Sequence, residues 1–236
     1  MKTLISQLKQ DTRFIEGMNA CISCGTCTAI CPAAAFYNYD PRQVVVDVQR
    51  NDEEKILELL KSETIWYCGE CMSCKTRCPR NNTPGLIIMA LRALSQKLGY
   101  FTESEKGRQQ LVLKRTVGEW SLKYGYCMYP AGLTTEDFPE QGPVWDWEHE
   151  HLKDVMDRLG ANFECDGPGV LRKIPQDALD EIYKIFEITG AIKSFENIEK
   201  CSKQKAEQMQ LSFDETHNNE YFAHIFTANN GTHFKE

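Results

Sequence analysis

The cysteines of this chain are gathered in two runs of identical spacing. Eight of the 11 cysteines lie between residues 21 and 78 of the 236-residue chain. The two runs are Cys21, Cys24, Cys27 and Cys31, and Cys68, Cys71, Cys74 and Cys78. In each run two residues separate the first three cysteines, three residues precede the fourth, and a proline follows. Such crowding in one segment indicates a local inorganic site rather than disulfides spread through a fold.

This spacing is that of the bacterial two-cluster ferredoxin run, in which cysteine thiolates hold [4Fe–4S] clusters. Two intervening residues let three thiolates reach one cluster from a tight loop, whose N–H groups hydrogen-bond the cluster sulfurs. The fourth cysteine of each run ligates the other cluster. The sequence therefore predicts two clusters, the first held by Cys21, Cys24, Cys27 and Cys78, the second by Cys68, Cys71, Cys74 and Cys31.

Zinc and disulfides are the alternative interpretations of these runs. Zinc sites commonly pair two Cys-x2-Cys halves and require neither a fourth cysteine in each run nor a trailing proline. Disulfides are disfavoured in a reducing compartment. If the runs exchange ligands, loss of metal should unfold residues 15–85. Gly25 and Gly69 lie inside the runs, where we expect little side-chain bulk to be tolerated.

The bulk composition narrows the class of protein. A hydrophobic content of 42%, with 11 Phe, 9 Tyr and 4 Trp, can build a core. A formal net charge of −7 disfavours an electrostatic nucleic-acid binder. The N-terminus has no apolar segment typical of a secretion signal, and no run of about 18 apolar residues exists, so we expect no direct membrane insertion. These features predict a cytoplasmic protein that meets a membrane only through partners.

Amphipathic spacing and capping residues predict a mainly α fold. Helices are expected at Leu4–Leu8, after Pro32, over 51–62, from Thr83 as N-cap to Leu98, over 149–159, and from Pro175. The stretch Val44–Val46 fits either a strand or a short helix opened by Pro41. We predict an α-helical ferredoxin domain holding two [4Fe–4S] clusters over residues 1–105, followed by a loop-rich helical extension over 106–236.

Basic residues accompany only the second run. Lys75, Arg77 and Arg80 lie in or beside it, whereas no basic residue lies between Cys21 and Cys31. Nearby cations favour the reduced, more negative state of a cluster. We therefore hypothesise that the second cluster has the higher potential, with ordinary surface charges as the alternative interpretation.

The runs and their neighbours also resemble one family. The residues that carry the resemblance are 21–32 (CISCGTCTAICP), 39–42 (YDPR), 65–68 (IWYC) and 78–80 (CPR). Residues 14–98 are similar to the C subunit of heterodisulfide reductase, and look closest to the C subunits of the heterodisulfide-reductase-like complexes of sulfur oxidisers. The resemblance implies an electron relay between a flavin-containing A subunit and a B subunit that performs disulfide or sulfur chemistry on its own clusters.

Other functions fit parts of the sequence. One alternative is the C subunit of a methanogen-type reductase of the CoM-S-S-CoB heterodisulfide. The iron–sulfur subunit of a quinone-linked dehydrogenase would place a plant-type [2Fe–2S] domain first, and only 20 residues precede Cys21. A freestanding ferredoxin would not need a long segment beyond the cluster domain, and clusters with a purely structural role are a further interpretation. Because neither a dinucleotide fingerprint nor a nucleophile with its base is evident, we expect an oxidoreductase subunit without bond-making catalysis of its own.

The remaining reactive residues carry weaker predictions. Cys127, Cys165 and Cys201 have no partners at ligand spacing, so each is expected to be a buried or neutral thiol. His149 and His151 are two residues apart, do not share a helix face and are not expected to form a metal pair. The aromatic and acidic stretch at 145–148 is expected to be a docking surface for another subunit, with an ordinary core loop as the alternative.

Overall fold

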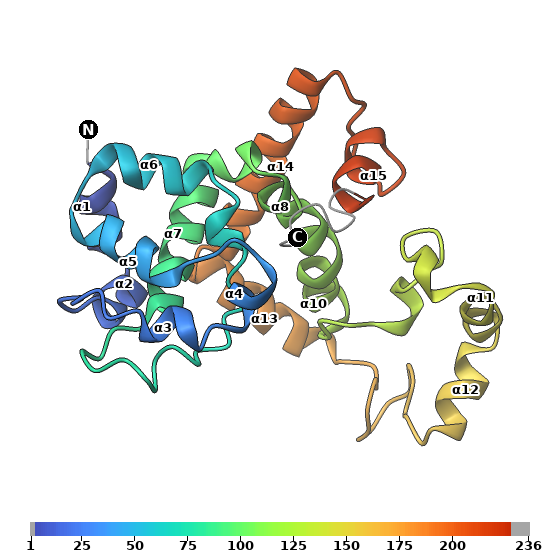
Figure 1. Ribbon diagram of the computed structural model, residues 1–236. Coiled ribbons are helices and arrows are strands. Elements are labelled where there is room, and N and C mark those ends of the chain that lie inside the picture. The colour runs from blue at the N-terminus through green and yellow to red at the C-terminus, as the bar shows by residue number, and fades with distance from the viewer. Residues whose placement is uncertain (1–2, 228–236) are drawn as a thin grey trace. The chain divides into compact units, whose positions relative to one another are not determined.

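The computed structural model of the chain describes residues 3–227, and this part of the chain is helical, without a β-strand (Figure 1). The α-helices are α1 (Leu4–Leu8), α2 (Thr12–Gly17), α3 (Thr26–Ala29), α4 (Pro32–Phe36), α5 (Pro41–Gln49), α6 (Glu53–Lys61), α7 (Pro84–Leu98), α8 (Glu105–Arg108), α9 (Gln110–Leu113), α10 (Glu119–Tyr124), α11 (Pro143–Glu150), α12 (Leu152–Arg158), α13 (Gln176–Ile188), α14 (Ala191–Met209) and α15 (Glu220–Thr227). Shorter turns are η1 (Thr64–Trp66), η2 (Tyr100–Glu103), η3 (Lys114–Gly118), η4 (Pro130–Gly132) and η5 (Pro139–Gln141). The mainly α fold class is confirmed.

The chain divides into two compact units. Unit 1 consists of the described parts of residues 1–110, 200–211 and 224–236, and unit 2 of residues 111–199 and 212–223. Both cysteine runs belong to unit 1. No helix among the described residues is long and apolar enough to cross a membrane.

The valine-rich stretch that left strand and helix open is helical, within α5. The Asp40 carboxylate caps this helix by accepting hydrogen bonds from the N–H groups of Arg42 and Gln43, and Pro41 occupies the first turn. Val44 and Val48 on one face are buried. Burial of that face outweighs the weak helix preference of β-branched residues.

Helix α7 is the central element of unit 1 and contacts α1, α2, α5 and α6. Its buried face includes Ile87, Ile88, Leu91 and Leu94, each of which stabilises the fold by about 1.5–3 kcal/mol when fully removed from water. Thr83 stands at the predicted N-cap, but its side chain makes no capping hydrogen bond. The helix instead begins next to α2, because the Thr83 N–H donates to the carbonyl of Gly17, 2.8 Å away.

Unit 2 contains a buried arginine that ties three segments together. Arg115, whose side chain is 1% exposed, forms a two-pronged ion pair with Glu199 at 2.8–2.9 Å. The same guanidinium donates to the carbonyls of Asp214 and Thr216, each 2.6 Å away. All its groups are therefore partnered, as a charge in a low-dielectric interior requires.

Unit 2 also contains a separate small core, and the helices beside it differ from the prediction. Its buried residues are Tyr129, Leu152, Met156 and Phe163. The single helix expected over 149–159 is instead two helices, α11 and α12, which break at His151. Pro143 starts α11 earlier than predicted, because proline suits the first helical position.

Candidate metal centres

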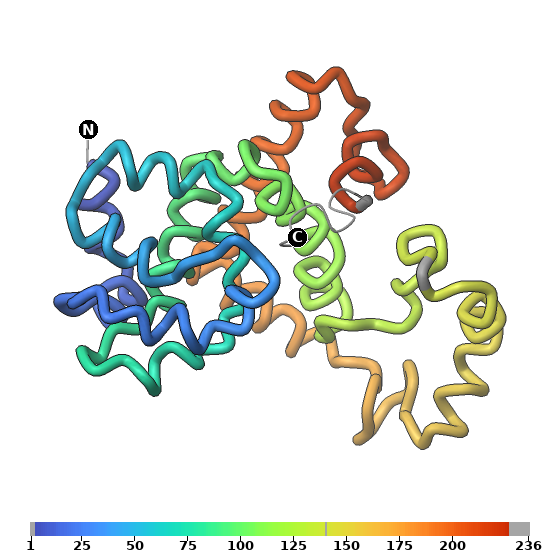
Figure 2. Tube along the Cα trace, in the orientation of Figure 1, coloured from blue at the N-terminus to red at the C-terminus, as the bar shows by residue number. Residues whose placement is uncertain are grey.

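The two cysteine runs form two loops of unit 1 that lie side by side. The first leads from α2 through α3 to Cys31, the N-cap of α4, and the second connects η1 to α7 (Figure 2). Asn19 joins them, since its N–H donates to the Asn82 side chain at 2.7 Å and its side-chain amide to the Asn81 carbonyl at 3.0 Å. Arg80 also donates to the carbonyl of Ala20, 3.4 Å away.

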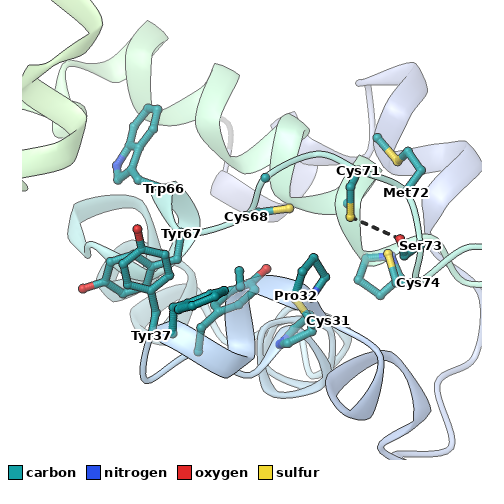
Figure 3. A pocket seen from close by; sticks show the side chains of 17 residues that line it. Cys31, Pro32, Tyr37, Trp66, Tyr67, Cys68, Cys71, Met72, Ser73 and Cys74 are labelled. Carbon is teal, nitrogen blue, oxygen red and sulfur yellow. Dashed lines mark hydrogen bonds between the residues drawn. The ribbon is translucent and has the colours of Figure 1, made fainter. Parts of the chain in front are cut away.

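The structure sorts the eight cysteines into two pockets. The first pocket is lined by Cys21, Cys24, Cys27 and Cys78. The second pocket is lined by Cys31, Cys68, Cys71 and Cys74 (Figure 3). Each pocket therefore draws three thiols from one run and the fourth from the other, the same sets that the spacing predicts. Their ligation of clusters stays a prediction.

The two loops begin with the same backbone turn. In the first, the N–H of Ser23 donates to the sulfur of Cys21 at 3.4 Å, and in the second the N–H of Glu70 donates to the sulfur of Cys68 at 3.4 Å. Ser23 and Glu70 both have left-handed backbone angles, with φ of 56° and 53°. An N–H group aimed at a thiolate stabilises its negative charge.

The second cysteine of each run repeats the likeness. Cys24 hydrogen-bonds the Thr26 hydroxyl at 3.4 Å, and Cys71 hydrogen-bonds the Ser73 hydroxyl at 3.4 Å (Figure 3). Hydrogen bonding with these hydroxyl groups lowers the pKa of both exposed thiols. The third cysteine of each run also shows the same behaviour in both loops, but here the pKa is raised. Burial raises the pKa of Cys74, and it raises that of Cys27 to about 11. A buried thiol of this kind ionises when a metal supplies positive charge.

Gly25 has a left-handed backbone, with φ of 82°. The equivalent residue of the second loop is Met72, with φ of 57°, so both loops require this turn, which glycine adopts most readily. A Cβ atom added at Gly25 or at Gly69 would meet no described protein atom within 4 Å. The expectation that bulk is poorly tolerated beside a cluster stays a prediction.

The residues present fit iron–sulfur clusters. Each pocket is lined by four cysteines drawn from both loops. Backbone N–H groups already hydrogen-bond Cys21, Cys68 and, from Asn82 at 3.2 Å, Cys78. Among residues 3–227 no three Cys, His, Asp or Glu side chains converge closely enough to hold a single metal ion. A cubane offers four separate iron corners and so takes thiolates spaced around it.

The linings of the two pockets differ. The first pocket is tight, about 20 Å³, and two of its lining residues are Arg42 and Arg80. The second is about 370 Å³ and has no lysine or arginine among its described lining residues. Arg80, which the sequence assigned to the second cluster, therefore lies at the first pocket. The charge argument for a higher potential at the second cluster loses that cation.

Aromatic residues wall the second pocket. They are Phe36, Tyr37, Tyr39, Trp66 and Tyr67. The rings of Tyr37 and Tyr67 stack with centroids 4.6 Å apart and planes within 6° (Figure 3). Such a wall lowers the local dielectric around anything bound in the pocket.

Arg92 of α7 holds the entry to the second loop and was not anticipated from the sequence. Its guanidinium donates to the carbonyls of Ile65 and Cys68 and to the carboxylate of Glu70, each at 2.6 Å. In the sequence this arginine only interrupts an apolar helix. No spacing pattern links it to a loop that lies more than 20 residues earlier.

The three other cysteines lie apart from both pockets. Cys127 and Cys165 are exposed, which excludes the buried alternative of the prediction for them. Both stand in turns and loops of unit 2. Cys201 is half-buried, and burial raises the pKa of its thiol.

Comparisons with known proteins agree with this geometry. A family of 4Fe-4S dicluster domains matches residues 17–82. The C subunit of the ferredoxin:CoB-CoM heterodisulfide reductase of Methanosarcina acetivorans is 46% identical over 170 residues, which cover 68% of this chain and 62% of that relative. An iron-sulfur C subunit of a CoB--CoM heterodisulfide reductase of Methanocaldococcus jannaschii is 27% identical over 146 residues, 60% of this chain and 72% of that protein.

A third relative has the same kind of name. It is the C subunit of the H(2):CoB-CoM heterodisulfide,ferredoxin reductase of Methanothermobacter marburgensis, 28% identical over 133 residues, which are 53% of this chain and 69% of that protein. The match to the Methanosarcina acetivorans protein spans far more of the chain than the dicluster domain does. Shared cysteine spacing alone does not account for it, and the chain is similar to heterodisulfide reductase C subunits well beyond the dicluster domain.

Proposed function

We propose that the chain is an electron-relay subunit of a heterodisulfide reductase complex, with one [4Fe–4S] cluster in each pocket. The observation that carries the proposal is the pair of four-cysteine pockets on two adjoining loops. A [4Fe–4S] cluster held by four thiolates accepts and releases one electron at a time. In this role electrons pass between a flavin-containing A subunit and a catalytic B subunit, and this chain makes and breaks no bond of the substrate.

The names of the relatives support the methanogen-type alternative over the sulfur-oxidiser type. All three relatives described above are subunits of CoB–CoM heterodisulfide reductases. The Methanosarcina acetivorans match covers 68% of the chain and therefore extends well beyond residues 1–105, into the C-terminal extension.

The residues of this chain have three tasks in the proposed relay. The eight cysteines hold the clusters, each pocket receiving one thiol from the opposite loop. The N–H groups of Ser23, Glu70 and Asn82 hydrogen-bond ligand sulfurs and offset their charge. The aromatic wall of the second pocket lowers the local dielectric there, which strengthens the electrostatic interactions of a bound cluster.

Residues 106–236 are proposed as the region that docks on partner subunits. Exposed apolar side chains on α11 support this assignment, since Val144 is 74% and Trp147 54% exposed. Trp145 points differently and donates to the carbonyl of Leu133, so it secures the helix to its neighbouring loop. Large exposed aromatic residues are enriched at interfaces.

The test is anaerobic purification with iron and sulfide analysis, followed by mixing with the purified A and B subunits from the same source. The proposal expects about eight irons and eight sulfides per chain, a complex by size-exclusion chromatography, and cluster reduction by the reduced flavin of the A subunit. A double variant, Cys24→Ser and Cys71→Ser, is the matched control and should bind the partners without relaying electrons. A chain with zinc in place of iron, or one reduced equally fast without any partner, would overturn the proposal.

A further inference from the structure

The side chain of Tyr39 has an unexplained property. It is 4% exposed, and its hydroxyl oxygen is buried with no hydrogen-bond partner among the described residues. Burying a hydroxyl without a partner costs about 1–3 kcal/mol, so native proteins rarely leave one in this state. An acceptor that becomes effective only in the cluster-loaded protein, such as a ligand thiolate, is therefore expected next to it.

Other tyrosines of the chain show the usual outcome. The hydroxyl of Tyr129, a residue that is 5% exposed, donates to the carboxylate of Glu164 at 2.8 Å. The hydroxyl of Tyr126 donates to the carbonyl of Arg172 at 3.2 Å. The hydroxyl of Tyr39 lacks such a partner, and the residue lies in the lining of the second pocket beside Cys31, Cys68 and Cys74.

The environment of Tyr39 is set by Cys68 and Cys31. Both thiols line the same pocket as the phenol ring. A phenol is a hydrogen-bond donor at neutral pH, because its ordinary pKa is about 10. A thiolate bound to a cluster is an acceptor of the required charge, and hydrogen bonds to ionised acceptors are the strong ones.

The position of the ring is fixed from several sides. Tyr39 meets the ring of Tyr67 edge-on, with centroids 6.4 Å apart and planes at 74°. Its backbone N–H donates to the carbonyl of Tyr37 at 2.8 Å. The next residue, Asp40, caps α5. The hydroxyl is thus held in place rather than free to turn towards solvent.

We propose that Tyr39 is a positioning residue of the second cluster, whose hydroxyl donates a hydrogen bond to the ligand sulfur of Cys68 and stabilises the reduced state. The inference rests on the proposed function only in that the second pocket holds a [4Fe–4S] cluster. The reduced cluster carries one more negative charge than the oxidised one, so the hydrogen bond strengthens on reduction. The donor raises the potential of this cluster and leaves the first cluster unaffected.

The test is an EPR-monitored redox titration of the reconstituted full chain carrying Tyr39→Phe. At a fixed potential the ratio of reduced to oxidised second cluster should fall about tenfold, which is 59 mV for a one-electron couple, and the first cluster should titrate as in the wild type. Tyr37→Phe is the matched control, because it removes a phenol from the same wall without touching the orphaned hydroxyl. A Cys71→Ser variant assigns which signal belongs to the second pocket.

A spectroscopic measurement keeps the proposal testable if Tyr39→Phe fails to assemble. Tyr37→Phe protein made with tyrosine carrying ¹⁷O at the phenol oxygen should show an ¹⁷O coupling in the ENDOR spectrum of the reduced second cluster. Both clusters present, with unchanged potentials in Tyr39→Phe or with no ¹⁷O coupling, would overturn the inference and leave the relay intact. A chain that binds no iron would instead overturn the proposed function.

Discussion

The two cysteine pockets share a backbone and differ in what surrounds it. Both loops present an N–H group to their first cysteine and a hydroxyl to their second. Yet the first pocket is lined by Arg42 and Arg80 and the second by aromatic rings. The comparison teaches that the repeated spacing determines where sulfur is gathered, whereas residues outside the repeat determine the electrostatic environment of each site.

The largest effect should come from the cysteines that cross between the loops. Cys78→Ser should lower the iron content by about half through loss of the cluster in the first pocket, although the residue belongs to the second run. Cys31→Ser should do the same for the second pocket. Iron analysis and EPR of the two variants check this. Loss of the cluster of its own run in either variant would contradict the exchange.

The next largest effect is a loss of stability in unit 2 that should leave the EPR signals of both clusters unchanged. It tests whether the pockets alone determine those signals. Arg115→Met, in unit 2, should lower the free energy of unfolding by about 3–5 kcal/mol, because it removes the buried guanidinium that pairs with Glu199 and with the carbonyls of Asp214 and Thr216, while Lys114 still pairs with Glu199. Both EPR signals should stay as in the wild type. Denaturant titration provides the measurement, and Arg158→Met, which breaks an exposed pair with Asp154, is the control and should cost less than about 0.5 kcal/mol. Altered cluster signals in Arg115→Met would refute the prediction that the pockets alone determine those signals.

A smaller effect concerns the turn that the loops share. Gly25→Ala should destabilise the chain by about 1 kcal/mol, because a side chain is strained at its left-handed φ of 82°. Gly69→Ala should cost less, since no described protein atom lies within 4 Å of the added Cβ and its φ is not left-handed. Thermal unfolding of the two anaerobic holoproteins checks the difference. Equal losses would show that bulk near the cluster, and not backbone angle, limits both positions.

The arginines at the first pocket should have a modest effect on potential. In Arg80→Gln the ratio of reduced to oxidised first cluster at a fixed potential should fall about twofold to fivefold, as expected for one partly solvated charge. Arg77→Gln is the control, because Arg77 lies in the same run but is not among the described residues that line either pocket. An equal shift of both clusters in Arg80→Gln would show a general surface-charge effect.

The smallest expected effect concerns pH: the contribution of Glu199 to the free energy of unfolding should not change between about pH 8 and about pH 5.5. Burial opposes ionisation of Glu199, but hydrogen bonds from Arg115 and Lys114 outweigh it and hold the pKa of this carboxyl below 4.5. A lowered pKa contributes stability that is fully present above the unfolded value and is lost only as pH falls through the folded value. The stability difference between wild type and Glu199→Gln should therefore be constant from about pH 8 to about pH 5.5. A difference that shrinks towards the acid end would indicate a pKa that is not lowered.

Spacing and capping residues made part of this structure predictable. The sets of cysteines that share a pocket, the helix α7 begun by Pro84, and the helix α6 capped by Asp52 all follow from local signals. The helical state of Val44–Val46 did not, because burial in α5 decided it over local propensity. The roles of Tyr39 and Arg92 could not be predicted from local signals either. Their roles depend on contacts with a loop more than 20 residues away.

The crossing of one cysteine into each pocket also has a consequence for cluster assembly while the chain is being synthesised. A ribosome releases the thiols of the first run well before Cys78, so a nascent chain that stops short of this residue offers three thiols and never four at its first pocket. The second pocket likewise waits for Cys74, although Cys31 has long been made. Iron–sulfur delivery to both sites is thereby tied to synthesis of the second run, and a chain truncated before Cys74 has four thiols at neither pocket.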